Sequence, residues 1–306
     1  MRVARVAAQA KINLFLRVGP RRPDGFHDVA TMFLLVDLAD DIIVRVDGAG
    51  RTLHVAGPRL PASGLGPTEK NLAYRAAVAY AERASWPAGF SIELTKNIPA
   101  GGGLGGGSSD AGAVLRALDA LNDRPLGQAG LEQLATLLGS DVPFFVSGSA
   151  RAFATGRGEE VGGLDPLEAR EVLLVVPPYG VATADAYQWL DEDRTRSGSA
   201  SAPATGAAAE APRMEAKPAG MDEWEFVRRA SHNDFEPIVE ARHPGLRRYR
   251  EQLLQHGASI ARLSGSGSTV FGIFGALPTR PGDLGTEAVV LRTRTSTRVV
   301  QVEARE

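Results

Sequence analysis

The feature that most constrains this chain is a glycine-rich run, in which six of the seven residues 101–107 are glycine. Backbone so free of side chains can adopt positive φ angles and approach a ligand closely. The residues behind the run predict an amphipathic helix, because apolar side chains recur at helical spacing: Ala111, Val114, Leu115, Leu118 and Leu121. We expect Ser108, Ser109 or Asp110 to cap that helix. A glycine loop that leads into a helix start predicts a phosphate-binding site.

The run matches neither of the two common phosphate-binding motifs. A dinucleotide fold places its glycines directly after a buried strand, whereas residues 96–99 separate the strand predicted at 90–94 from this run. The P-loop pattern requires a lysine where this chain has Gly107. A flexible linker is the alternative, but linkers usually lack an amphipathic helix directly behind them. We therefore interpret the run as a phosphate cradle of another type.

Composition sets broad limits on the function. The 306 residues suffice for two domains, and 43% hydrophobic with 23% charged residues is ordinary for a soluble globular protein. A net charge of −2 gives no general attraction to nucleic acid or to an acidic membrane. The absence of cysteine excludes disulfides, thiolate metal ligands and cysteine nucleophiles. No apolar stretch approaches the ~18 residues of a membrane span, so we expect a soluble, cytoplasmic protein.

The order of predicted elements indicates an α+β fold in two domains. A strand at 10–18 places Lys11 and Asn13 on the same face, and a turn at 22–25 leads to a buried strand at 29–38. Further along, we expect helices at 68–84, 128–138, 183–190 and 246–255, strands at 171–176, 259–263 and 269–274, and an edge strand at 297–302. Because strands and helices alternate without a dinucleotide-type start, α+β is favoured over a doubly wound fold. We place the domains at 1–163 and 164–306, with a disordered insertion at 193–220 that has almost no large apolar residues.

Three polar clusters could together support phosphoryl transfer: Lys11 with Asn13, the glycine loop, and Asp141. This reaction needs a cradle for the donor phosphates, charge compensation, and a group that accepts the proton of the attacking hydroxyl. Asp141 could be that base, and Lys11 could keep it ionised. Taken alone, however, Lys11 is better explained as an ordinary cation on a strand face and Asp141 as a helix-end or turn residue, and nothing in the sequence brings them together.

Three blocks of the sequence resemble the motifs of the GHMP kinases, which include galactose, homoserine, mevalonate and phosphomevalonate kinases. Residues 98–109 resemble the central glycine motif, residues 10–16 the N-terminal motif and residues 262–267 the C-terminal motif. Four further blocks are similar to one branch of that family, whose substrate carries a cytidine diphosphate group: 23–27, 70–72, 139–144 and 231–235. The blocks stand in the family's order.

The resemblance implies a two-domain architecture with a mixed α/β N-terminal domain, a ferredoxin-like α+β C-terminal domain, and the active site in the cleft between them. It implies an ATP-dependent phosphotransferase with an alcohol acceptor, in the non-mevalonate route to isoprenoid precursors. ATP would be the phosphoryl donor and Mg²⁺ would accompany it, without a metal site built by the protein alone. Asp141 would be the catalytic base, with Lys11 beside it. Neither nucleic acid nor a membrane is an expected partner.

The resemblance also implies the remaining site residues. ATP would be bound by Pro99, Ala100, Gly101, Gly102, Gly103, Leu104, Gly105, Gly106, Gly107, Ser108 and Ser109, with Lys96 and Asn71 nearby. Asn13 would hold the acceptor end of the substrate. Phe26 and Tyr187 would sandwich the cytosine ring, and His27 would hydrogen-bond its polar edge. The substrate pocket would be completed by Phe33, Thr183, Gly265 and Ser266.

Several alternatives stay open. Phe33 lies in an apolar strand and is also explained as a core residue, while His27 is also explained as a solvated loop residue. Phe26 stands where many members of the family have tyrosine, so the ring is kept and one hydroxyl contact is absent. The whole chain could instead be another GHMP kinase, acting on homoserine or mevalonate, or a non-catalytic nucleotide-binding module. The aromatic pair Phe26 and Tyr187 suits a base better than a small acid, and the presence of both Lys11 and Asp141 disfavours a non-catalytic module.

Overall fold

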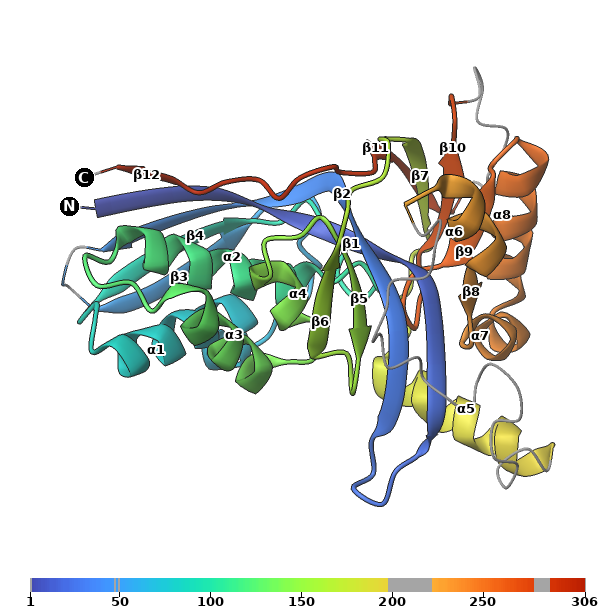
Figure 1. Cartoon of the computed structure of the whole chain (residues 1–306), viewed down its shortest axis with the longest axis horizontal. Helices are drawn as coiled ribbons and strands as arrows, with labels where there is room; N and C mark the ends of the chain where they lie inside the picture. The colour runs from blue at the N-terminus through green and yellow to red at the C-terminus, as the bar shows by residue number, and fades with distance from the viewer. Residues whose placement is uncertain (1, 47, 49, 198–221, 278–286, 306) are drawn as a thin grey trace.

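The computed structural model describes residues 2–46, 48, 50–197, 222–277 and 287–305, which form two β-sheets with helices packed against them (Figure 1). The first sheet has the order β12-β1-β2-β4-β3, with β5 beside β2, β6 beside β5, and β8 beside β1. Its strands are β1 (Arg2–Arg21), β2 (His27–Val46), β3 (Arg51–Ala56), β4 (Phe90–Thr95), β5 (Arg151–Thr155), β6 (Glu160–Leu164), β8 (His232–Asn233) and β12 (Glu303–Arg305).

Strands β1 and β2 form a long antiparallel hairpin that runs from the N-terminal edge of the molecule to its lower edge near α5 (Figure 1). The strands predicted at 10–18 and 29–38 are confirmed, but both are longer than predicted. The pairing register shifts between Gln9 and Lys11 and again between Asn13 and Phe15, and such irregularities bend a strand without ending it. The hairpin therefore belongs to the first sheet at one end and extends beyond it at the other.

Four α-helices and a short 3-10 helix follow or interrupt the strands of the first half of the chain. They are η1 (Thr68–Lys70), α1 (Leu72–Ala84), α2 (Gly106–Leu121), α3 (Gly127–Leu138) and α4 (Val142–Val146). Their apolar faces share one core with the first sheet, in which Val44, Tyr80, Val114 and Leu118 are fully or almost fully buried. This burial agrees with the apolar periodicity that predicted the helix behind the glycine run.

The predicted capping of that helix is wrong, because α2 begins earlier, at Gly106. Its N-cap is Gly105, which has the left-handed φ of 70° and makes no side-chain cap. Ser109 and Asp110 lie inside the helix and are buried, so their side chains serve other contacts: the Ser109 hydroxyl donates to the Gln9 carbonyl over 2.7 Å. The first free N–H groups of α2 therefore belong to the glycine run itself.

The second sheet is antiparallel and has the order β11-β7-β10-β9. Its strands are β7 (Glu171–Val176), β9 (Ile260–Leu263), β10 (Val270–Phe274) and β11 (Val289–Arg294), and the helices of this half are α5 (Thr183–Arg196), α6 (Trp224–Ala230), α7 (Glu236–Arg242) and α8 (Pro244–Gln255). Numbered along the chain, the four strands lie in the order 4-1-3-2 of a ferredoxin-like sheet. The predicted α+β class and ferredoxin-like second half are confirmed.

Helix α5 continues to Arg196, six residues beyond the predicted end at residue 190. The first residues of the predicted insertion at 193–220 are thus helical, and residues 198–220 lie outside the described residues. No helix among the described ranges is both long enough and apolar enough to cross a membrane.

The prediction of an edge strand at 297–302 is wrong, because the structure has no strand there. The C-terminal segment instead pairs with β1 only at β12, so both ends of the chain lie side by side (Figure 1). In the segment before β12, side chains form hydrogen bonds with the backbone. Gln9 Oε1 accepts from the Val300 N–H over 2.8 Å, and the Arg116 guanidinium donates to the Val300 carbonyl. Backbone groups bound in this way cannot join a strand ladder.

Candidate active site

The glycine run connects β4 to α2 and lies against both halves of the molecule. Gly101, Gly103 and Gly105 have φ angles of 71°, 75° and 70°, which favour glycine. A Cβ atom on Gly103 would lie 2.0 Å from the Ser264 carbonyl oxygen, so no other residue fits there without displacing backbone. On the other side, the Lys11 N–H donates to the Leu104 carbonyl over 3.0 Å. The loop is thus held between β1 and the second half of the chain.

The partner of the loop in the second half is the turn between β9 and β10. The Ser264 hydroxyl donates to the Gly103 carbonyl over 2.9 Å, and the Thr269 N–H donates to the Gly102 carbonyl over 3.1 Å. The buried amide of Asn233 donates to the carbonyls of Leu263 and Gly265 over 2.7 and 2.8 Å and so fixes the turn from β8. The two glycine-rich segments, about 160 residues apart in sequence, therefore meet at one place.

Lys11 and Asp141 also meet at this place, which confirms the prediction that they converge. The Lys11 ammonium lies 3.6 Å from Asp141 Oδ2, and the side chains are 4% and 33% exposed. Asp141 precedes α4, whereas Lys11 stands on β1 and donates to Asn13 Oδ1 over 2.7 Å. The Asn13 amide donates in turn to Thr31 Oγ1 over 2.8 Å, so the ammonium is oriented by a chain of hydrogen bonds.

Burial lowers the pKa of Lys11 below its ordinary value, against the opposing charge of Asp141. The buried ammonium places a positive charge beside a carboxylate that remains partly open to solvent. The pair therefore offers a proton acceptor and a positive charge side by side.

Lys96 holds a second buried ion cluster, below the first turn of α2. Its ammonium donates to Asp40, and to Asp110 Oδ2 over 2.7 Å. Burial alone would lower the pKa of Lys96, but Asp110 and Asp40 together raise it. Asp40 Oδ1 also accepts from the N–H groups of Asn97 and Ile98, whereas Asp110 Oδ1 is buried with no hydrogen-bond partner among the described residues. Two carboxylates thus share one ammonium, and Asp110 is the less well stabilised of the two.

A cavity of about 510 Å³ opens between these groups. The following predicted site residues line it: Lys11, Asn13, Phe33, Asn71, Lys96, Pro99, Ala100, Gly101, Gly102, Gly103, Leu104, Gly105, Gly106, Gly107, Ser108, Asp141, Thr183, Tyr187, Gly265 and Ser266. Ser109 does not line it, because its side chain turns toward Gln9. Asn71 lies at the wall as the N-cap of α1, where its side chain accepts from the Ala73 N–H.

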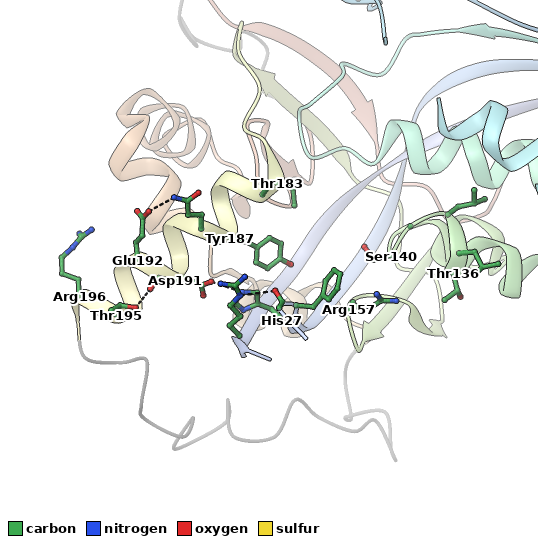
Figure 2. A pocket seen from close by; sticks show the side chains of 18 residues that line it. His27, Thr136, Ser140, Arg157, Thr183, Tyr187, Asp191, Glu192, Thr195 and Arg196 are labelled. Carbon is green, nitrogen blue, oxygen red and sulfur yellow. Dashed lines mark hydrogen bonds and ion pairs between the residues drawn. The ribbon is translucent and has the colours of Figure 1, made fainter. Parts of the chain in front are cut away.

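A larger cavity of about 1280 Å³ adjoins the first and contains Phe26, His27 and Tyr187 in its wall (Figure 2). The His27 ring stacks on Tyr187 with centroids 5.0 Å apart. Phe26 is 53% exposed, and the Arg157 guanidinium lies 5.1 Å from its ring centroid. In this arrangement the Tyr187 ring contacts His27, and the partner of Phe26 is Arg157.

Phe33 satisfies both of its interpretations. It is almost fully buried and stacks on Phe144 with centroids 4.9 Å apart, as a core residue does. It also lines the smaller cavity, and the Lys11 ammonium lies 5.5 Å from its ring centroid, within the range of a cation–π contact.

The cavity walls also contain residues that were not predicted from the sequence, among them Ser140, Arg157 and Asp191. Ser140 and Arg157 line both cavities, as Thr183 and Tyr187 do, and Asp191 lines the larger one. Asp191 could have been found from its position one helical turn after Tyr187. Arg157 follows the end of β5 in a glycine-flanked turn, and no periodic pattern in the sequence marks it.

Comparison with known proteins places this geometry in a class. Residues 71–149 match the model of the GHMP kinase N-terminal domain, and residues 224–283 match that of the GHMP kinase C-terminal domain. The chain is therefore a GHMP kinase, as the glycine loop between two sheets indicates.

Its relatives define the family within that class. The chain is 38% identical over 270 residues to the 4-diphosphocytidyl-2-C-methyl-D-erythritol (CDP-ME) kinase of Desulfotalea psychrophila, covering 87% of this chain and 84% of the relative. It is 42% identical over 271 residues to the CDP-ME kinase of Anaeromyxobacter dehalogenans, covering 87% and 79%. A crystal structure of a CDP-ME kinase superposes with a TM-score of 0.72 at 32% identity, covering 95% of this chain and 98% of the other. The chain belongs to the CDP-ME kinase family.

Proposed function

We propose that this chain transfers the γ-phosphoryl group of ATP to the 2-hydroxyl of CDP-ME, in the non-mevalonate route to isoprenoid precursors. The observation that carries the proposal is the Lys11–Asp141 pair beside the glycine loop, in a chain related to named CDP-ME kinases over most of its length. The substrate roles of individual residues are part of the proposal.

The smaller cavity would receive the triphosphate. Free N–H groups at the start of α2 and the positive end of its dipole are suited to phosphate oxygens. Asn71 and Lys96 line the same cavity, so both would lie near the nucleotide. The Lys96 ammonium is paired with Asp40 and Asp110, so the positive end of α2 rather than Lys96 would supply the charge for the phosphates.

The two ends of CDP-ME would occupy the two adjoining cavities. Its cytosine would lie in the larger cavity beside Phe26, His27 and Tyr187, and its methylerythritol end would reach Asn13 and Asp141. The diphosphate would then lie where the two cavities meet, beside the residues that line both of them. Arg157 is the one basic residue in the described ranges found in both walls, and a guanidinium suits phosphate oxygens.

In the proposed reaction, the Asp141 carboxylate accepts the proton of the 2-hydroxyl while the hydroxyl oxygen forms a bond to the γ-phosphorus. The bond between that phosphorus and the bridging oxygen of ADP breaks, and ADP leaves. Lys11 adds positive charge beside Asp141, where the acceptor oxygen reacts. The glycine loop supplies positioning, which is most of what catalysis of phosphoryl transfer requires.

Mg²⁺ is part of the proposal as an ion that arrives with ATP. In the described ranges, no group of three or more His, Cys, Asp or Glu side chains is arranged to hold a metal ion. The Asp110 and Asp141 carboxylates of the smaller cavity wall already face Lys96 and Lys11, and phosphate oxygens and water are usual ligands of a nucleotide-bound Mg²⁺. The residues therefore fit an ion held mainly by phosphates, whose chemistry is to neutralise charge on the transferring group.

A cytoplasmic location, without nucleic acid or membrane as partner, belongs to the proposal as well. It is supported by the net charge of −2 and by the small-molecule substrate of the named relatives.

The direct test is to incubate the purified protein with ATP, Mg²⁺ and each of CDP-ME, homoserine and mevalonate, and to detect the phosphorylated product by mass spectrometry. We expect a product that is heavier by one phosphoryl group from CDP-ME and none from the other two. Product from homoserine or mevalonate alone would reject the substrate, and no product from any of the three would reject the kinase activity.

A further inference from the structure

The segment between β11 and β12 connects the two sheets and contacts β1 two residues before Lys11. We call residues 295–300 the β11–β12 linker. It leaves the second sheet after β11 and runs beside β1 to reach β12 (Figure 1). The Ser296 N–H donates to the Leu35 carbonyl over 2.9 Å, and Leu35 is the β2 residue that pairs with Lys11. The linker therefore reaches the part of the hairpin that carries the ammonium of the candidate site.

Gln9 is the β1 residue that holds this linker. Its side chain is buried and uses both ends of its amide: Nε2 donates to Ser296 Oγ over 2.8 Å, and Oε1 accepts from the Val300 N–H over 2.8 Å. The Ser296 hydroxyl donates onward to the Arg298 carbonyl over 2.9 Å, so the linker folds around the amide. A displacement of Gln9 would leave buried polar groups unpaired, which is costly, so these bonds fix its position.

The backbone of Gln9 connects the linker to the glycine loop. Its carbonyl accepts from the Ser109 hydroxyl in the first turn of α2, and two residues along β1 the Lys11 N–H donates to the Leu104 carbonyl over 3.0 Å. The pairing register of β1 with β2 shifts between Gln9 and Lys11. Because the ladder is irregular at this point, pairing with β2 alone holds this part of β1 less firmly than a regular strand.

We propose that Gln9 is a positioning residue for phosphoryl transfer, which ties the β11–β12 linker to β1 and thereby sets the place of the Lys11 ammonium beside Asp141. The inference rests on the proposed function. Gln9 is not among the described residues that line the two cavities, so it acts through Lys11 and the glycine loop instead of contacting a substrate. A misplacement of about 1 Å in a reacting group can cost on the order of 100-fold in rate.

The experiment compares the steady-state kinetics of wild type, Gln9→Leu and a matched control with ATP and CDP-ME. Leucine keeps most of the side-chain volume and removes the amide hydrogen bonds. We expect Gln9→Leu to lower kcat roughly 10- to 100-fold and to leave both KM values nearly unchanged, because the residues that line the cavities are the same. The control Gln301→Ala removes an exposed amide directly after the linker, which donates to the Val299 carbonyl over 3.2 Å, and should keep the wild-type kcat.

A milder variant keeps the test decisive if Gln9→Leu folds poorly. Ser296→Ala removes only the acceptor of Gln9 Nε2, and we expect a smaller fall in kcat, again with unchanged KM. In the double variant the two losses should not add, since both substitutions break one contact. Urea unfolding of each variant gives the folded fraction to which its kcat is normalised, so a role in stability alone leaves the normalised kcat unchanged.

The inference is overturned if the normalised kcat of Gln9→Leu and of Ser296→Ala equals that of the wild type, or if their losses add as independent effects do. A rise in KM without a fall in kcat also overturns it, because Gln9 would then support substrate binding and not the reaction. A wild-type protein without activity overturns the proposed function, and this inference with it.

Discussion

At the scale of single residues, the site depends on ion pairs between residues that are far apart in sequence. The residues next to each charge in the sequence do not indicate its partner. Lys11 stands on β1 and Asp141 lies about 130 residues later, directly before α4, and only the fold brings their side chains to 3.6 Å. Their chemistry could be predicted from residue type and from the family resemblance, but their contact could not. The Asp40–Lys96–Asp110 cluster was missed for the same reason, since its residues come from β2, from the loop after β4 and from α2.

This cluster predicts a pH dependence of stability. Burial raises the pKa of Asp110 to about 8, with Lys96 opposing and Asp40 adding to the shift. The folded state therefore holds a proton that the unfolded state releases near its ordinary pKa, so stability from this group is present below that value and is lost as pH rises through about 8. Asp110→Asn cannot titrate and should lose this slope.

The measurement is the free energy of unfolding in urea at pH 5 and pH 9. Relative to wild type, Asp110→Asn should gain on the order of 1 kcal/mol or more between the two pH values. The control Asp123→Asn, at an exposed ion pair with Arg2, should follow the wild-type profile. A constant difference between wild type and Asp110→Asn would show that Asp110 does not titrate in this range.

At the scale of elements, the predicted helices and strands mostly exist, and the errors lie at their ends. Periodicity found α2 because its buried face is regular, but propensity placed the cap on Ser108 to Asp110 instead of Gly105. A glycine in the left-handed region lets the helix begin inside the loop, and tertiary contacts then use the Ser109 and Asp110 side chains. The tail at 297–302 has the composition of a strand, but side chains from β1 and α2 bind its backbone first.

The glycine loop should tolerate a methyl group at one position and not at another. Gly103→Ala would place Cβ 2.0 Å from the Ser264 carbonyl at a φ of 75°, so we expect a loss of about 2 kcal/mol or more in unfolding free energy. Gly107→Ala meets only Leu72 at 3.7 Å and should change stability little. Urea denaturation of both variants distinguishes them, and equal stabilities would mean that the loop does not pack against the second half as described.

At the scale of the whole molecule, two sheets are joined by the β1–β2 hairpin, by β8 beside β1 and by the two glycine segments. The α+β class and the ferredoxin-like second half were predictable from element order and family motifs. The return of β12 to the first sheet and the pairing of β8 with β1 were not, because pairs so distant in sequence leave no local pattern. The boundary placed between residues 163 and 164 stays a prediction.

Substitution of Asn233 tests whether its side-chain hydrogen bonds fix the β9–β10 turn that contacts the glycine loop. Asn233→Ala would leave the carbonyls of Leu263 and Gly265 without their donor, which should lower the unfolding free energy by about 2 kcal/mol and raise the KM for substrate. Asn122→Ala removes a comparable amide, bound to Tyr80 within the first half, and should affect stability without changing KM. If Asn233→Ala lowers stability and leaves KM unchanged, the turn does not depend on Asn233 for its place in the site.

The central claim is that Asp141 accepts the proton of the acceptor alcohol beside phosphates held by glycine backbone. Its most direct test is Asp141→Asn, with ATP binding measured by calorimetry and turnover of CDP-ME measured on the same preparation. We predict unchanged ATP affinity, which also reports correct folding, and a fall in turnover of roughly 10²- to 10⁴-fold. Turnover equal to that of the wild type would contradict the claim and remove Asp141 from the reaction.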